Sequence, residues 1–483
     1  MEKAWRKPNG PRSGRFSHKS NLFIEAELAN ELLIKNIRYL LTMAGDPLDH
    51  SAGSAILIKG NQVVGIYPPG TVLPLADRII DGSKHLIMPG LINCHHHFYQ
   101  TLTRSLPRAA NAKLFDWLLY LYDIWAVMTP EDLRSASAVA AAELLLSGCT
   151  TALDHFYVFP NGDNSFFDAE VEGVRPTGLR LHLTRGSMSL SRKDGGLPPD
   201  SLVQTDQEIM NHTADVVSRY HEPEPFGMLR VVPAPCSPFS VTEDILRQTA
   251  ALASEKNLSL HTHLAETEDE EKFCIEKHGL RPVDYMEQVG WLTENVILAH
   301  SVWVNSDEIL RYADRGCAIA HCPTSNMRLG SGIAPVVDML KAGVKVGLGV
   351  DGSASNDSSH MIQEMRQALL LQRVKYGATS ITSRDVLRMA TVGGAEVLGR
   401  TDIGMVKAGY AADLIGINLD KIWYAGAQAD PPAAIVLCHT DNVDLSIVNG
   451  EVVIEKGRLT KIDLDELVSR HNQNSAKLYK RAL

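Results

Sequence analysis

The stretch 89–97 reads Pro-Gly-Leu-Ile-Asn-Cys-His-His-His and places three histidines directly after a short apolar run. In an extended strand, side chains two residues apart point to the same side, so His95 and His97 face one way and His96 faces the other. Two imidazoles that converge at the end of a strand form half of a zinc-type site. A chance cluster of histidines near the surface is the alternative, and the rest of the chain bears on the choice.

Further apolar runs follow this first one, and stretches with helical patterns separate them. Their near-continuous hydrophobicity is typical of strands that are buried on both faces. Eight such units over roughly 300 residues predict a (β/α)8 barrel of the TIM type. An open doubly wound sheet is the alternative, but it would normally carry a Gly-rich phosphate turn where this chain has histidines. The runs are 86–97, 149–158, 178–186, 229–235, 258–265, 296–304, 317–323 and 344–350.

Both ends of the chain have a different pattern, in which short β-type runs are broken by Gly, Asn and Asp. We expect these two pieces to join into one small β-sandwich domain beside the barrel. A basic N-terminal segment rich in Gly, Pro and Ser is predicted to be a flexible tail, and the chain is predicted to end in a helix. The expected units are 1–20 for the tail, 21–85 and 403–460 for the β-sandwich, 86–402 for the barrel and 461–483 for the helix.

Composition excludes several classes of protein. An apolar fraction of 45% and a charged fraction of 22% are those of an ordinary globular enzyme. A net charge of −10 argues against nucleic acid as a partner, because phosphate binding needs a basic surface. No apolar run approaches the roughly 20 residues that cross a bilayer, so no membrane partner is expected. The seven cysteines are never spaced as CxxC, which favours a reducing, cytoplasmic location.

A second cluster, His261-Thr262-His263-Leu264-Ala265-Glu266, lies at the end of the fifth run. We take His263 as a third metal ligand and Glu266 as a proton carrier, because a carboxylate can move a proton from water to a ring nitrogen. A charge at the start of the following helix is the alternative for Glu266. His261 is left unassigned, since it fits a packed core position equally well.

Two more candidates end the sixth and eighth runs. His300 would face the substrate or a water molecule, and Asp351 in Gly-Leu-Gly-Val-Asp-Gly would be costly to bury unless it is paired or bound to a metal. His95, His97, His263 and Asp351 together supply three imidazoles and one carboxylate with a position left open, which is typical of a catalytic metal site. The fourth run has no lysine to bridge two metals, so one divalent ion is expected, Zn²⁺ or else Fe²⁺.

These motifs together resemble the amidohydrolase superfamily, in particular its mononuclear branch of nucleobase deaminases and aminohydrolases. The resemblance runs from about residue 32 to residue 459 and includes LAHSVW at 298–303, HCPTSNMRLGSG at 321–332 and GLGVDGSASND at 347–357. It implies a metal role for His95, His97, His263 and Asp351. It also implies catalytic roles for Glu266, His300 and Asp351, with His300 orienting water and substrate.

Within that branch, the predicted loops are most similar to those of bacterial 8-oxoguanine deaminases. The resemblance implies hydrolytic deamination of 8-oxoguanine to urate and ammonia by an enzyme that forms a homo-oligomer. Guanine deaminases have an arginine where this chain has Pro-Ala-Pro at 233–235. The similar segments are 95–104, 114–126, 147–162, 185–191, 195–201 and 234–241. The candidate substrate-binding residues are Gln100, Trp125, His155, Tyr157 and Arg185. For the last four of them, simple packing of the loops is the alternative.

Other functions stay open at this point. The same metal site fits another aminated heterocycle, such as isoxanthopterin, guanine or an alkylamino s-triazine. A non-catalytic scaffold with this fold would be expected to have lost metal ligands, yet each expected position is filled. The small zinc deaminases that act on nucleic acid carry a PCxxC motif, and Pro235-Cys236-Ser237-Pro238 lacks its second cysteine.

Overall fold

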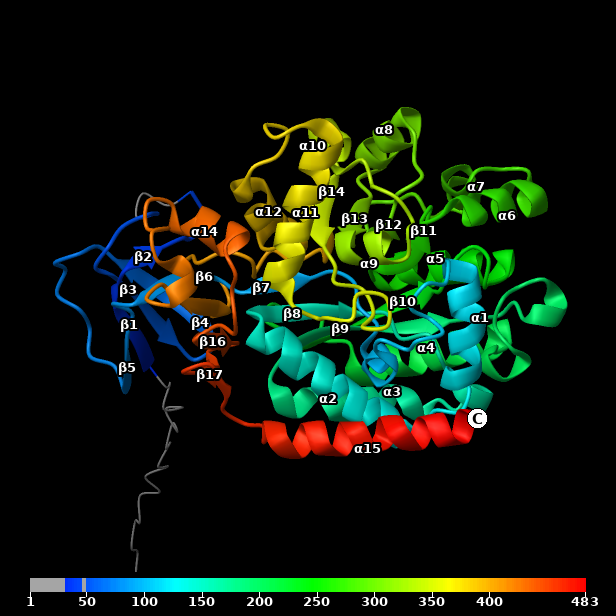
Figure 1. Cartoon of the computed structure of the whole chain (residues 1–483), viewed down its shortest axis with the longest axis horizontal. Coiled ribbons are helices and arrows are strands. Elements are labelled where there is room, and N and C mark those ends of the chain that lie inside the picture. Colours follow the sequence, from blue (N-terminus) through cyan, green and yellow to red (C-terminus); the bar gives the residue numbers. More distant parts are fainter. Residues whose placement is uncertain (1–30, 46–48) are drawn as a thin grey trace, which may run out of the picture.

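The computed structural model describes residues 31–45 and 49–483, so the predicted flexible tail at 1–20 lies outside the described residues. A barrel surrounded by helices forms the larger part, and a small β-domain lies at one side of it (Figure 1). Among the described residues, no helix is both long and apolar enough to span a membrane.

Eight parallel strands form the central sheet, in the order β10-β9-β8-β7-β14-β13-β12-β11. The two outermost strands of this order approach each other at their ends, where the Cys236 carbonyl accepts a hydrogen bond of 3.1 Å from the His263 amide. Each predicted run overlaps one of these strands, which confirms the TIM-type barrel. The strands are β7 (Leu91–Asn93), β8 (Cys149–Asp154), β9 (Arg180–Ser187), β10 (Leu229–Pro235), β11 (Leu260–Leu264), β12 (Val296–His300), β13 (Ala318–His321) and β14 (Lys345–Leu348).

Helices connect and cover these strands. Several begin at a side chain that caps the first turn; Thr205 and Asn305, for example, form capping boxes with a glutamate three residues later. The helices in the barrel region are α1 (Leu114–Trp125), α2 (Pro130–Leu146), α3 (Ser165–Val174), α4 (Asp206–Tyr220), α5 (Glu243–Lys256), α6 (Glu268–His278), α7 (Pro282–Gln288), α8 (Ser306–Arg315), α9 (Pro323–Arg328), α10 (Val336–Ala342), α11 (Met361–Tyr376), α12 (Ser383–Met389) and α13 (Val392–Val397). Near the C-terminus follow α14 (Pro431–Leu437) and α15 (Leu464–Ala482).

The small domain consists of two sheets, ordered β4-β3-β1-β5 and β18-β17-β16-β15-β6-β2. The N-terminal strand β6 pairs with the C-terminal strand β15, so the two chain ends do form one β-sandwich, as the sequence predicts. Its strands are β1 (Glu31–Ile37), β2 (Tyr39–Leu40), β3 (Ser54–Lys59), β4 (Gln62–Tyr67), β5 (Arg78–Asp81), β6 (His85–Pro89), β15 (Leu414–Asn418), β16 (Leu445–Val448), β17 (Glu451–Glu455) and β18 (Arg458–Leu459). The domain boundaries stay a prediction.

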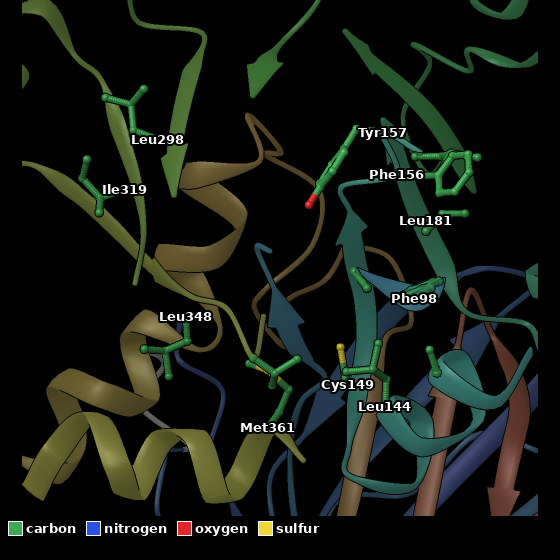
Figure 2. Close-up of a cluster of buried hydrophobic side chains, with 14 of the residues drawn as sticks. Phe98, Leu144, Cys149, Phe156, Tyr157, Leu181, Leu298, Ile319, Leu348 and Met361 are labelled. Carbon is green, nitrogen blue, oxygen red and sulfur yellow. The ribbon is translucent and has the colours of Figure 1, made fainter. Parts of the chain in front are cut away.

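The run 86–97 divides between the two domains at Gly90, since β6 belongs to the sandwich and β7 to the barrel. A Cβ atom at Gly90 would lie 2.1 Å from the Thr150 hydroxyl, so only glycine fits there. Phe98, directly after the three histidines, belongs to a buried apolar cluster with Phe156 and Leu181, while the Tyr157 ring points the other way from Phe156 (Figure 2). The turn that carries the histidines therefore rests on a close-packed core.

Candidate active site

The ends of four barrel strands bring the predicted metal ligands and catalytic residues together. His95 and His97 follow β7, His263 lies in β11, His300 ends β12 and Asp351 follows β14. All five are buried, with exposed fractions of 8% or less. Their convergence at the carboxyl ends of the strands is where barrels of this type carry their chemistry.

Ring nitrogens and a carboxylate oxygen face one another at the centre of this site. Asp351 Oδ1 lies 3.3 Å from Nε2 of both His95 and His97, and Nε2 of His97 lies 3.1 Å from Nε2 of His263. Ligand atoms bound to a tetrahedral zinc ion at about 2.0–2.1 Å lie about 3.3 Å from each other. The observed spacings therefore fit ligand atoms around one metal ion.

The protonation of His97 and His263 also fits a metal site. Nδ1 of His97 donates to the His155 carbonyl at 2.7 Å, and Nδ1 of His263 donates to the Cys236 carbonyl at 2.6 Å. Burial holds the pKa of both rings below the ordinary value, so the rings are neutral and their Nε2 atoms carry lone pairs. Two lone pairs that face each other beside a carboxylate repel unless a cation lies between them.

Asp351 supplies the negative charge of the group. Burial alone would raise its pKa, but the neighbouring His95, His300 and His97 outweigh burial and hold the pKa well below the ordinary value. Its Oδ2 atom also accepts a hydrogen bond of 3.1 Å from the Ser355 hydroxyl. Asp351 is thus an ionised carboxylate, and Nε2 of His95 beside it is buried with no hydrogen-bond partner among the described residues.

Two further histidines, His261 and His155, lie next to the predicted ligands. His261 Nε2 lies 2.8 Å from His95 Nδ1, so the residue that the sequence left unassigned orients a predicted ligand. His155, His95, His97 and His263 each have a ring nitrogen within 4.8 Å of a ring nitrogen of the other three. The structure therefore places His155 among the predicted ligands, whereas the sequence suggested a contact with substrate.

Glu266 and His300, the two residues predicted to transfer protons and to orient water, lie close together. Nε2 of His300 lies 3.7 Å from Glu266 Oε2 and 4.0 Å from Asp351 Oδ2, and its Nδ1 donates to the Asn326 side chain at 2.9 Å. Burial raises the pKa of Glu266. Burial would lower the pKa of His300, but the carboxylates of Glu266 and Asp351 outweigh it, and the pKa is raised. Both shifts favour the protonated form of the side chain, so each group can hold a proton at a higher pH than its free counterpart.

A cavity with an empty volume of about 380 Å³ opens over these residues. Gln100 and Tyr157, two of the predicted substrate-binding residues, line it. Gly352 leaves room for Gln100, because a Cβ atom there would lie 1.9 Å from the Gln100 Oε1 atom. The full lining comprises His97, Gln100, Leu114, Trp117, Leu118, Tyr122, Tyr157, Cys236, Phe239, His263, Glu266, His300, Leu329, Asp351 and Ser355.

Trp125, His155 and Arg185 do not line this cavity. Trp125 packs edge-on against Tyr99, and its indole N–H donates to the Thr103 hydroxyl at 3.3 Å. Arg185 is fully buried and donates to His212 at 2.8 Å and to the Gln204 side chain at 2.7 Å. Its donors thus point into the protein rather than toward a bound substrate.

One wall of the cavity is the face of α1 that carries Leu114, Trp117, Leu118 and Tyr122. These residues lie in the similar segment 114–126, but none of them was among the predicted substrate-binding residues. Their spacing of three and four residues places them along one helical face. This spacing was a usable signal, because the exposed Asp116 and Asp123, seven residues apart, mark the opposite face of the helix. The pattern does not show which residues of the buried face line the cavity and which pack against the barrel.

Comparison with known proteins agrees with this geometry. The profile of the amidohydrolase family matches residues 86–453. The chain belongs to the amidohydrolase family. An 8-oxoguanine deaminase of Pseudomonas aeruginosa is 46% identical to this amidohydrolase over 447 residues, which cover 92% of this chain and 98% of the relative.

More distant relatives of this amidohydrolase act on other rings. Hydroxydechloroatrazine ethylaminohydrolase of Pseudomonas sp. (strain ADP) is 35% identical over 432 residues, which cover 86% of this chain and 89% of the relative. The crystal structure of atrazine chlorohydrolase from Arthrobacter aurescens TC1, complexed with zinc, superposes with a TM-score of 0.87 at 33% identity. That match covers 92% of this chain and 99% of the other. This amidohydrolase therefore shares its fold over nearly its whole length with a zinc-containing hydrolase.

Proposed function

We propose that this amidohydrolase deaminates 8-oxoguanine to urate and ammonia with the aid of one divalent metal ion. The observation that carries the proposal is the group of unprotonated ligand atoms at the strand ends, with the Glu266–His300 pair beside it. The 46% identity to an 8-oxoguanine deaminase supports the choice of substrate.

His95, His97, His263 and Asp351 would hold the metal ion. The facing lone pairs of His97 and His263 and the unpartnered Nε2 of His95 fit a cation. A Lewis acid held there makes a water molecule nucleophilic near neutral pH. Zinc is favoured because it accompanies the structural relative, and Fe²⁺ fits the same imidazole and carboxylate ligands.

Glu266 would carry the proton. Its carboxylate takes a proton as water adds to C2 of 8-oxoguanine and delivers it to the adjacent ring nitrogen. The second water proton passes from the new C2 hydroxyl to the amino group, the C2–N bond breaks, and ammonia leaves as the C2 carbonyl forms. His300, held by Asn326 at 2.9 Å, would orient the attacking water against the ring. One water molecule is consumed and one ammonia is released, so atoms balance.

Gln100 and Tyr157 would select the base. Gln100 accepts a hydrogen bond of 3.2 Å from the Ala354 amide through Oε1, which leaves its amide N–H groups to donate to a purine edge. Tyr157 adds a hydroxyl to the cavity lining. A site that pairs with the extra N–H and carbonyl of 8-oxoguanine leaves buried groups unpaired around guanine, and this loss can lower kcat/KM by orders of magnitude. We leave Trp125, His155 and Arg185 out of this proposal.

A panel of bases tests the function. Purified, metal-loaded enzyme is given 8-oxoguanine, guanine, isoxanthopterin and an alkylamino s-triazine, and ammonia release is measured. We expect the highest kcat/KM for 8-oxoguanine, with urate as the second product. Equal or better kcat/KM for guanine, or activity only on the pterin or the triazine, would overturn the substrate while keeping the hydrolase chemistry.

A further inference from the structure

Glu270 is a buried acid that the mechanism above does not use. It lies in the first turn of α6 and is fully buried, whereas Glu268 two residues earlier is exposed. Burying a carboxylate is costly unless hydrogen bonds satisfy it. Both of its oxygens are satisfied by main chain: Oε1 accepts from the Ala265 amide at 2.8 Å, and Oε2 accepts from the Glu266 amide at 2.9 Å.

The peptide that Glu270 holds is in an unusual conformation. Ala265 has a φ of 52°, in the left-handed region that residues with a Cβ adopt only at an energetic cost. Its carbonyl is held as well, because it accepts hydrogen bonds from the Val302 amide at 2.9 Å and the Trp303 amide at 2.8 Å. Hydrogen bonds therefore hold both the amide and the carbonyl of Ala265.

Main-chain hydrogen bonds also connect the Ala265 segment to the segment that carries His300. His300 and Ser301 also have positive φ values, of 73° and 46°. The Ser301 amide donates a hydrogen bond of 3.0 Å to the carbonyl of Leu264, the residue before Ala265. The two chain segments that present Glu266 and His300 are thus fixed to each other by main-chain hydrogen bonds.

The Glu266 carboxylate accepts few hydrogen bonds from described side chains. Its one hydrogen bond from a described side chain comes from the Ser331 hydroxyl and is 3.3 Å long. The direction of its carboxylate is therefore set mainly by its backbone, and the backbone amide of Glu266 is held by Glu270.

We infer that Glu270 is a positioning residue that fixes the Glu266 carboxylate against His300 through the amides of Ala265 and Glu266. The inference rests on the proposed deaminase function. A misplacement of about 1 Å at a reacting group can cost on the order of 10² in rate, so loss of these hydrogen bonds should appear in kcat.

Two substitutions and a control test the inference. Glu270→Gln keeps one acceptor oxygen and Glu270→Ala keeps none, while Glu268→Gln removes an exposed charge from the same turn. We expect kcat to fall about 10-fold in Glu270→Gln and about 100-fold in Glu270→Ala, with KM and metal content within about twofold of wild type. Unchanged kcat in the metal-loaded Glu270 variants, even with a lower Tm, would overturn the inference.

A double variant separates positioning from a general structural role. If Glu270 acts through Glu266, then adding Glu270→Gln to Glu266→Gln should lower kcat no further. A further 10-fold loss would contradict the inference. Should Glu270→Ala not fold, Glu270→Gln and this cycle decide the question.

Crystal structures distinguish this inference from the proposed function. If wild-type enzyme deaminates no base of the panel, the proposed function fails, and the structures of wild type and Glu270→Gln still report on Glu266. Displacement of the Glu266 carboxylate in the variant supports the positioning role. An unmoved carboxylate refutes it.

Discussion

The cavity has two walls of different origin. The metal wall, which we define as the lining residues His97, His263, Asp351, Glu266 and His300 together with the buried His95 beside Asp351, comes from strand ends and the residues directly after them. The helix wall, Leu114, Trp117, Leu118 and Tyr122, comes from one face of α1. The metal wall consists of titratable groups in defined hydrogen bonds, and the helix wall is mainly apolar. We expect the metal wall to carry the chemistry and the helix wall to set the shape of the substrate site.

The two walls should also respond differently to substitution. On the metal wall each side chain has defined partners, as His263 has in the Cys236 carbonyl at 2.6 Å. Loss of one group there leaves other buried polar groups unpaired. On the helix wall, truncation removes packing area and changes the fit of the ring instead.

The largest effect is expected for His263→Ala, which removes a predicted metal ligand. We expect the metal to be lost and kcat/KM to fall by at least about 10³-fold, because the metal supplies several kcal/mol of transition-state stabilisation. Metal analysis and ammonia release measure the two effects. His439→Ala, at an exposed histidine, is the control. A variant that keeps both metal and turnover would remove His263 from the metal wall.

Glu266→Gln should have the next largest effect. The amide keeps the shape of the side chain but cannot transfer a proton, so kcat should fall by about 10²-fold or more while the metal stays bound. Kinetics on metal-quantified enzyme check this expectation, with Glu268→Gln as the matched surface control. Near-normal turnover with full metal would mean that another group carries the proton.

Tyr157→Phe tests the substrate side of the cavity. Loss of one neutral hydrogen bond of about 1 kcal/mol should lower kcat/KM for 8-oxoguanine about fivefold. The loss for guanine should be smaller if the hydroxyl pairs with an atom that only 8-oxoguanine has. Tyr410→Phe, outside the cavity lining, is the control. Equal losses for the two bases would show that this hydroxyl does not discriminate between them.

Arg185→Met should have the smallest effect on activity. Arg185 donates to His212 and Gln204 away from the cavity, so kcat/KM should stay within about threefold of wild type. The free energy of unfolding should fall by about 3 kcal/mol, because the buried partners lose their donor. Thermal unfolding and steady-state kinetics measure the two quantities. A tenfold loss of kcat/KM at unchanged Tm would instead restore Arg185 as a substrate contact.

The sequence predicted the barrel and the arrangement of the metal wall for one physical reason. Parallel strands present their carboxyl ends at one edge, and the period of two in a strand assigns side chains to a face. The pattern His95-x-His97 and the terminal positions of His300 and Asp351 therefore carry three-dimensional information within a few residues. Their roles as ligands and catalysts stay predictions.

Residue positions that depend on tertiary packing were harder to predict from the sequence. Trp125 and Tyr122 belong to the same apolar helix, and only its placement on the barrel decides that Tyr122 lines the cavity and Trp125 does not. Glu270 lies in an acidic stretch, and nothing in the sequence separates it from Glu268 until the amides of Ala265 and Glu266 are located. The joining of the two chain ends into one sandwich was predicted, but β6 was expected to belong to the barrel run 86–97, and only its pairing with β15 places it in the sandwich.

Anomalous diffraction at the zinc absorption edge, from crystals of zinc-loaded enzyme, tests the central claim most directly. We predict one peak per chain, about 2.0–2.2 Å from His95, His97, His263 and Asp351. Two peaks per chain, or one peak bound by His155 in place of any of these four residues, would contradict the assignment of the metal wall.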